Sequence, residues 1–155
     1  MNRFQTKYKK EAINKDVANY LFKTLKNEVK WTDGIKTKNG GFTRKAFPVD
    51  PDSTLMEELL QYVDGCLNVL SEEKFVKFVI LGIYLNLYEN GDMYTPSHKH
   101  TNTYQLVISL GGTRTLTVGK KEYKMENGDA IIFGSSTHSV PKENNVVQPR
   151  ISIAS

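Results

Sequence analysis

Apolar residues recur at helical spacing in two stretches of the first half of the chain. Residues 15–30 place their apolar side chains on one face, and Asn14 stands where a helix cap is expected. Residues 54–70 repeat the pattern, beginning with the spacing of a capping box at Thr54. These patterns predict two amphipathic helices. Between them, the polar, glycine-containing residues 32–44 predict a loop or hairpin.

From residue 78 to the end, the pattern changes to short runs of β-branched and aromatic residues separated by glycine-containing turns. The expected strands lie near residues 78–88, 104–110, 113–118, 121–124, 129–133, 136–140 and 149–154. Two helices followed by closely spaced strands predict a mostly β (α+β) fold, a small barrel or sandwich with helices on one side. We expect a single domain over residues 1–155, with a helical region at 1–75 and the β core at 76–155.

Composition and charge say little about the fold, but they bear on the binding partner and on the compartment of the protein. The 155 residues carry a formal net charge of +4, and residues 1–50 hold 12 of the 21 Lys and Arg residues against 5 of the 17 acidic ones. This basic excess suits either a polyanionic partner or an ordinary solvated surface. A lone cysteine, Cys66, excludes a disulfide framework. With no secretory signal and no apolar run of about 20 residues, we expect a cytoplasmic or nuclear protein that does not bind membranes.

The three histidines are candidate ligands of one metal ion. His98 and His100 are two residues apart, so in an extended segment their side chains point to the same side. His138 follows the expected strand at 129–133, and a barrel can return it to the same place. Imidazole suits Fe(II), Zn(II), Ni(II) and Cu(II). Ordinary surface or core histidines are the alternative.

Two families combine such a pair with a distal histidine. The cupins place a glutamate a few residues after the pair, where this chain has Tyr104 and Gln105. The sequence more closely resembles the AlkB-like Fe(II)/2-oxoglutarate dioxygenases, over almost its whole length. The motifs that carry this resemblance are Asn86–Gly91 (NxYxxG), His98–His100 in the place of an HxD pair, Val107–Gly111 (VSLG), Asn127–Asp129 leading to His138, and the strand that begins at Arg150.

The resemblance implies a double-stranded β-helix (jelly roll) with two supporting N-terminal helices, and an oxygenase that uses Fe(II), 2-oxoglutarate and O2. The three histidines would be its metal ligands and catalytic centre. Arg150 would grip the distal carboxylate of 2-oxoglutarate through its planar guanidinium. The other residues implied in cosubstrate binding are Asn86, Tyr88 and Ser152.

His100 stands where the family has aspartate. Three neutral imidazoles leave a bound Fe(II) ion with its full charge of +2, whereas a carboxylate would reduce it. Three alternatives remain open: an active three-histidine enzyme, a weakly active metal-binding variant, and a site in which the His100 side chain turns away from the metal.

The resemblance further implies oxidative demethylation of N-alkylated bases in DNA or RNA. The family's lid corresponds to the short basic segment 36–47, which favours single strands. The candidate substrate-binding residues are Arg44, Lys45, Phe47, Asn102 and Arg114. We expect alkylated nucleic acid as the substrate and a monomer without an obligate protein partner. The alternatives are a catalytically weakened module that binds nucleic acid or metal, and a hydroxylase of a protein or small molecule.

Overall fold

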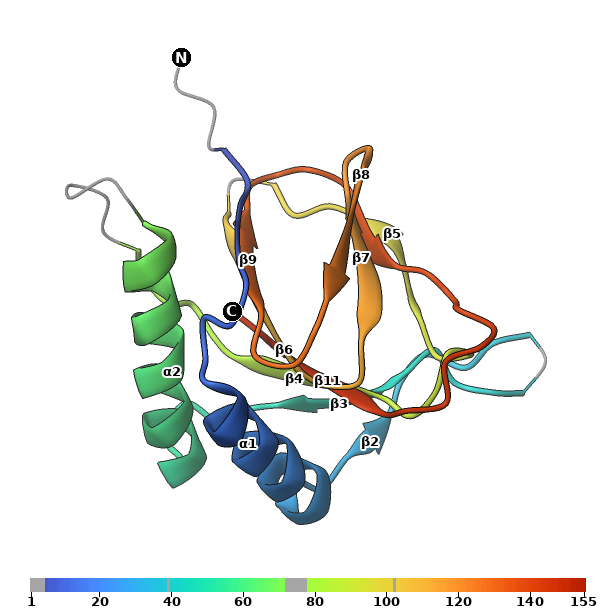
Figure 1. Ribbon diagram of the computed structural model, residues 1–155. Coiled ribbons are helices and arrows are strands. Elements are labelled where there is room, and N and C mark those ends of the chain that lie inside the picture. Colours follow the sequence, from blue (N-terminus) through green and yellow to red (C-terminus); the bar gives the residue numbers. More distant parts are fainter. Residues whose placement is uncertain (1–4, 39, 72–77, 102) are drawn as a thin grey trace.

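Both predicted helices are present in the computed structural model, which describes residues 5–38, 40–71, 78–101 and 103–155 (Figure 1). Helix α1 (Lys15–Glu28) is capped by Asn14, whose side chain accepts a hydrogen bond from the Asp16 amide at 2.8 Å. Helix α2 (Thr54–Leu70) is capped by Ser53, not by a capping box at Thr54, because the Ser53 hydroxyl accepts from the Met56 amide at 3.1 Å. None of the described helices is long and apolar enough to span a bilayer.

The strands form two antiparallel sheets. The large sheet has the order β1-β9-β6-β11-β4-β3-β2, and the small sheet has the order β5-β10-β7-β8. Their bounds are β1 (Lys7–Lys9), β2 (Thr32–Asp33), β3 (Lys45–Pro48), β4 (Tyr84–Tyr88), β5 (Thr95–His98), β6 (Gln105–Gly111), β7 (Arg114–Val118), β8 (Lys121–Met125), β9 (Ala130–Phe133), β10 (His138–Val140) and β11 (Arg150–Ala154). From β4 onward the chain passes back and forth between the two sheets, which confirms the expected jelly-roll fold.

Three segments differ from the predicted pattern. The strand expected at 78–88 is paired only from Tyr84, because its neighbours β3 and β11 end opposite that residue. Strand β5 was missed because Pro96 interrupts its pattern, and β1 was missed because it is short and rich in lysine. The segment 32–44 is the predicted hairpin, closed by pairing of β2 with β3 and by a bridge between Lys36 and Phe42.

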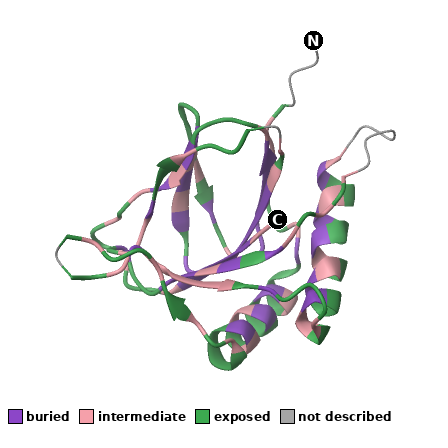
Figure 2. Cartoon of the chain, turned by 180° about the vertical axis from the view of Figure 1, so that it is seen from behind, coloured by how far each residue is buried: buried purple, intermediate pink, exposed green. Residues whose placement is uncertain are grey.

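Alternation along the strands divides the molecule into two cores. Ile151 and Ile153 of β11 belong to the larger core, where both helices pack on the outer face of the large sheet (Figures 1 and 2). Tyr88 and Phe133 belong to the smaller core between the two sheets. Because successive side chains of a strand point to opposite faces, Arg150 and Ser152 of β11 face the space between the sheets.

Candidate metal centre and cosubstrate pocket

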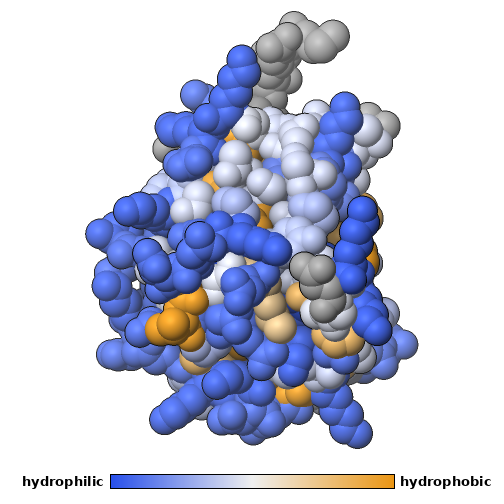
Figure 3. Space-filling model, turned by 90° about the vertical axis from the view of Figure 1, so that its right-hand side faces the viewer, coloured by the Kyte–Doolittle hydropathy of each residue, from blue (hydrophilic) through white to orange (hydrophobic). Residues whose placement is uncertain are grey.

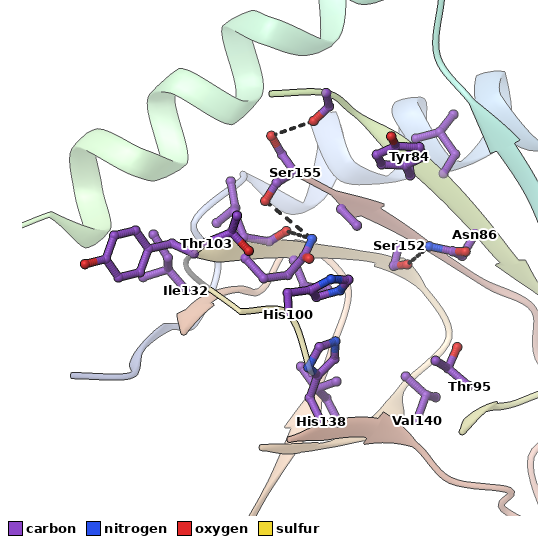
Figure 4. A pocket seen from close by; sticks show the side chains of 18 of the residues that line it. Tyr84, Asn86, Thr95, His100, Thr103, Ile132, His138, Val140, Ser152 and Ser155 are labelled. Atoms are coloured by element: carbon purple, nitrogen blue, oxygen red, sulfur yellow. Dashed lines mark hydrogen bonds between the residues drawn. The ribbon is translucent and has the colours of Figure 1, made fainter. Parts of the chain in front are cut away.

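The three histidines meet at one end of the space between the sheets. His98 ends β5 and His138 begins β10, and the two residues are direct partners in the antiparallel register. Their ring centroids are 4.1 Å apart, and those of His98 and His100 are 5.1 Å apart. Figure 4 shows His100 and His138 pointing into the same space. One ligand atom from each of the three histidines lies within 4.8 Å of the others, so the predicted cluster forms.

Backbone carbonyls orient two of these rings. The Nδ1 atom of His98 lies 2.8 Å from the Pro96 carbonyl oxygen, and that of His138 lies 3.3 Å from the Ser136 carbonyl oxygen. A carbonyl oxygen can only accept, so each Nδ1 carries the proton and each Nε2 keeps its lone pair for a metal. Within the described chain no carbonyl oxygen orients the His100 ring in this way, and its side chain is exposed.

The protonation state of His138 also suits metal binding. Burial, together with the nearby His98, lowers its pKa to about 4, so the ring is neutral at pH 7. Three imidazoles are ligands that suit a first-row transition metal such as Fe(II). Among the described residues, no carboxylate completes this cluster.

Arg150 lies fully buried between the sheets, and within the described part of the chain only one of its three guanidinium nitrogens has a hydrogen-bond partner. Its Nε donates to the Ser109 hydroxyl at 2.8 Å, but Nη1 and Nη2 have no partner. Burial lowers its pKa to about 10, so the guanidinium is still charged at pH 7. Two unpartnered parallel donors on a buried cation fit a carboxylate, which is what the distal end of 2-oxoglutarate offers.

The other expected cosubstrate residues lie beside Arg150 on the same face of the large sheet. The Tyr88 hydroxyl shares a 2.6 Å hydrogen bond with Thr95, and the ring of Tyr88 lies under the Arg150 guanidinium, 5.2 Å from its Cζ. Asn86 donates to the Ser152 hydroxyl at 3.3 Å (Figure 4). A single cavity of about 870 Å³ is lined by the three histidines and by Arg150, Tyr88, Thr95, Asn86 and Ser152. Ser109 is not among its lining residues. Neither Ser109 nor Thr95 could be predicted from the sequence, because both roles depend on strand register.

The structure brings only part of the predicted substrate set to the cavity. Arg44 and Phe47 line it, and Arg44 donates through Nε to the side-chain amide oxygen Oδ1 of Asn86 at 2.9 Å. Lys45 is not among the lining residues and pairs with Glu89 at 3.3 Å. Asn102 lies outside the described residues.

Arg114, a candidate substrate-binding residue from the sequence, lies away from the cavity. Its side chain is fully buried and does not line the cavity. Its guanidinium donates to the carbonyl oxygens of Asn90, Met93 and Pro141 at 2.8–3.0 Å and pairs with Glu143 at 3.3 Å. Arg114 therefore ties the β4–β5 loop to the β10–β11 loop, and each of its three guanidinium nitrogens already donates to a protein acceptor.

Of the described residues in the segment expected to form a lid, 36–47, those that line the cavity are Arg44, Ala46 and Phe47, at its end. The hairpin of residues 34–44 projects from the molecule beside the start of β5 (Figure 1), whereas the histidines lie where β5 ends. The Tyr94 amide hydrogen-bonds to the Thr43 carbonyl oxygen, which anchors the hairpin there. Seen from that side, the surface is mostly hydrophilic (Figure 3).

Comparison with known proteins gives one family match, to the family described as Cupin domain, over residues 85–142. This range includes the three histidines but covers less than half of the chain. The cupin pattern, set aside above because its glutamate is missing, is therefore the one that the family comparison detects. No curated protein sequence matches the chain.

Several solved structures share the fold across nearly the whole chain. A Trichoplax adhaerens prolyl hydroxylase, described in complex with a hypoxia inducible factor peptide, has 12% identity and a TM-score of 0.67, covering 96% of this chain and 81% of that chain. SnoN, a non-heme α-ketoglutarate-dependent epimerase from nogalamycin biosynthesis, has 14% identity and a TM-score of 0.69, covering 98% and 76%. OsALKBH1 has 13% identity and a TM-score of 0.59, covering 99% of each chain.

At these identities the likeness establishes the fold. The chain has the jelly roll of 2-oxoglutarate-dependent oxygenases, as expected. The narrower AlkB-like assignment is only weakly supported, because hydroxylases and an epimerase match at least as well as OsALKBH1.

Proposed function

We propose that the chain is an Fe(II)- and 2-oxoglutarate-dependent oxygenase. The observation that carries the proposal is the buried Arg150 guanidinium, whose two unpartnered nitrogens share a cavity with the three-histidine cluster. Leaving such a charge unpaired in a core is costly, so its retention points to an anionic ligand. The donor set of the histidines fits Fe(II), and a carboxylate on Arg150 fits 2-oxoglutarate.

When bound, Fe(II), 2-oxoglutarate and O2 supply the oxidation of a substrate C–H bond to C–OH, with 2-oxoglutarate converted to succinate and CO2. The residues of the chain hold and orient these groups. His98, His138 and His100 would hold the metal through their imidazole nitrogens. Arg150, held by Ser109 and lying against the ring of Tyr88, would bind the distal carboxylate of 2-oxoglutarate.

Oxidative demethylation of an N-alkylated base is the finer form of this proposal. Hydroxylation of an N-methyl group gives a hemiaminal, which releases formaldehyde. The AlkB-like motifs and the fold shared with OsALKBH1 support it. Phe47 and Tyr104, which line the cavity, supply aromatic surfaces on which a base could stack.

Hydroxylation of a peptide or an apolar small molecule is the second candidate. Arg44 and Arg150 are the only Lys or Arg residues among the described residues that line the cavity, and both already contact groups inside it. Nucleic-acid binding draws its affinity from many cationic contacts to phosphates. The exposed apolar side chains of Val79 and Leu81, which also line the cavity, favour a less charged substrate.

The test is succinate formation by anaerobically purified, Fe(II)-loaded protein after addition of 2-oxoglutarate and O2. Each assay is run with and without single-stranded oligonucleotides that contain N1-methyladenine or N3-methylcytosine. Succinate that rises with the methylated strand, together with loss of a methyl mass, would establish the demethylase. Succinate without demethylation would leave the oxygenase with another substrate. Metal binding without any succinate would identify a catalytically weakened metal-binding module.

A further inference from the structure

Residues 79–81 form an exposed apolar segment at the mouth of the cavity. Val79 and Leu81 are each 82% exposed, whereas the intervening Ile80 is half-buried. This alternation is that of a strand with one face toward solvent. The segment runs into β4, but it lies beyond the ends of both neighbouring strands.

The backbone of this segment is also unpaired. Just before β4 begins, two carbonyl oxygens still accept hydrogen bonds of 3.0 Å. That of Ile83 accepts from the Val49 amide, and that of Gly82 accepts from the Ser155 hydroxyl. Within the described chain, the backbone groups of residues 79–81 make no hydrogen bond. Free amide and carbonyl groups beside exposed apolar side chains are a template for an added strand.

The segment is continuous with the candidate active site. Val79 and Leu81 line the same cavity as the three histidines, and so do the half-exposed rings of Tyr84 and Tyr104. Figure 4 places Tyr84 and Ser155 on the side of the cavity that leads away from His138. A chain that paired with residues 79–81 would therefore enter the cavity from its apolar rim.

We propose that residues 79–81 are a docking strand for an extended polypeptide with apolar side chains at alternate positions, and that this polypeptide is the substrate. The second part rests on the proposed oxygenase. A peptide is the occupant that fits both features, because its own amides and carbonyls can satisfy the free backbone while its side chains cover Val79 and Leu81. A lipid or a nucleic acid has no such ladder of donors and acceptors.

A second copy of this chain fits less well. Three residues of strand span only about 10 Å. A stable dimer needs about 1,200 Å² or more of buried surface, which a contact of this length does not supply.

The experiment starts from a phage-displayed library of random twelve-residue peptides, selected against Ni(II)-loaded protein. Peptides enriched in the selection are synthesised, and their affinity is measured by fluorescence anisotropy. The double variant Val79→Asp/Leu81→Asp is compared with Val147→Asp, a matched control. Val147 is 81% exposed and does not line the cavity. Because all three side chains are exposed, the variants should fold as the parent does, which their melting temperatures will check.

The proposal expects enriched peptides with apolar residues at alternate positions. Their affinity should fall at least tenfold in the double variant and stay unchanged in Val147→Asp, and bound peptide should slow amide hydrogen exchange at residues 79–81. It is overturned if no peptide is enriched, or if the double variant binds as tightly as the parent. It is equally overturned if sedimentation reveals a dimer that the double variant dissociates.

Succinate formation separates this proposal from the proposed function. Peptides that dock as expected but stimulate no succinate would support the docking strand and remove its role in presenting a substrate. Conversely, succinate formation with a methylated oligonucleotide, and no selected peptide, would support the oxygenase and overturn the docking strand.

Discussion

Arg150 and Arg114 lie against the same ring, that of Tyr88, each with its guanidinium carbon 5.2 Å from the ring centroid. Both side chains are fully buried. Each donor nitrogen of Arg114 has a protein acceptor, whereas Arg150 keeps both Nη atoms without one. The two residues look alike in sequence, but one is built to hold the fold and the other to hold a ligand. The first two predictions test this difference.

Replacing Arg150 with Met should abolish cosubstrate binding without harming the fold. Two charge-assisted hydrogen bonds to the carboxylate, at about 1.5 kcal/mol or more each, correspond to at least about a 100-fold loss of affinity for 2-oxoglutarate. Since an unpaired buried charge is removed, the melting temperature should stay the same or rise. Calorimetric titration of the metal-loaded variant and a thermal melt measure the two effects. A lower melting temperature together with an unchanged affinity for 2-oxoglutarate would contradict the assignment.

Replacing Arg114 with Met should have the opposite signature. The change leaves the Asn90, Met93 and Pro141 carbonyl oxygens and the Glu143 carboxylate without their donor. The free energy of unfolding should fall by about 3 kcal/mol or more. In urea titrations the midpoint should therefore drop, whereas the folded variant should still bind metal normally. An unchanged midpoint would mean that the loops are held by other contacts.

The histidine cluster could be predicted from the sequence because it rests on local spacing and on one distal residue. His98 and His100 share a side of an extended segment, and a barrel that closes must bring its strand ends together. Arg150 was predicted differently, through the resemblance of its strand to the closing strand of the AlkB-like family. The spacing of His98 and His100, by contrast, is short-range geometry that a sequence displays directly.

What could not be predicted depends on register and on where partner strands stop. Arg114 has the residue type of a ligand-binding group, but only the fold reveals that three carbonyl oxygens surround it. The apolar run from residue 78 reads as one strand, yet β3 and β11 end opposite Tyr84, so its first residues are left unpaired. The hairpin at 34–44 has a lid's composition, but it is anchored away from the histidines.

Gly128, in the turn before β9, and Gly119, in the turn between β7 and β8, offer a matched pair of glycine substitutions. Gly128 has a φ of +92°, and a Cβ placed there would lie 2.4 Å from the Ile13 carbonyl oxygen. Gly119 also has a positive φ, +60°, but nothing lies within 4 Å of its Cβ position. Gly119→Ala should therefore cost about 1 kcal/mol for the backbone alone. Gly128→Ala should cost about 3 kcal/mol or more, since the backbone of the loop before α1 must also move. Chemical unfolding of both variants measures the difference, and equal costs would contradict the close contact.

We expect His100 to set which metal the site prefers, and it is the histidine best suited to substitution because it is exposed. In His100→Asp, an anionic oxygen joins the two carbonyl-oriented imidazoles of His98 and His138 and lowers the net charge of a bound divalent ion to +1. Oxygen ligands suit Mn(II), whereas imidazole suits Ni(II) and Zn(II). The ratio of the Kd for Mn(II) to the Kd for Ni(II) should therefore fall about tenfold or more in His100→Asp. His100→Ala is the control, since it removes a ligand without adding charge and should weaken binding of both ions. Calorimetric titrations of the metal-free proteins give these constants. An unchanged ratio in His100→Asp, with full affinity in His100→Ala, would show that His100 lies outside the coordination sphere and that the metal is held by His98 and His138.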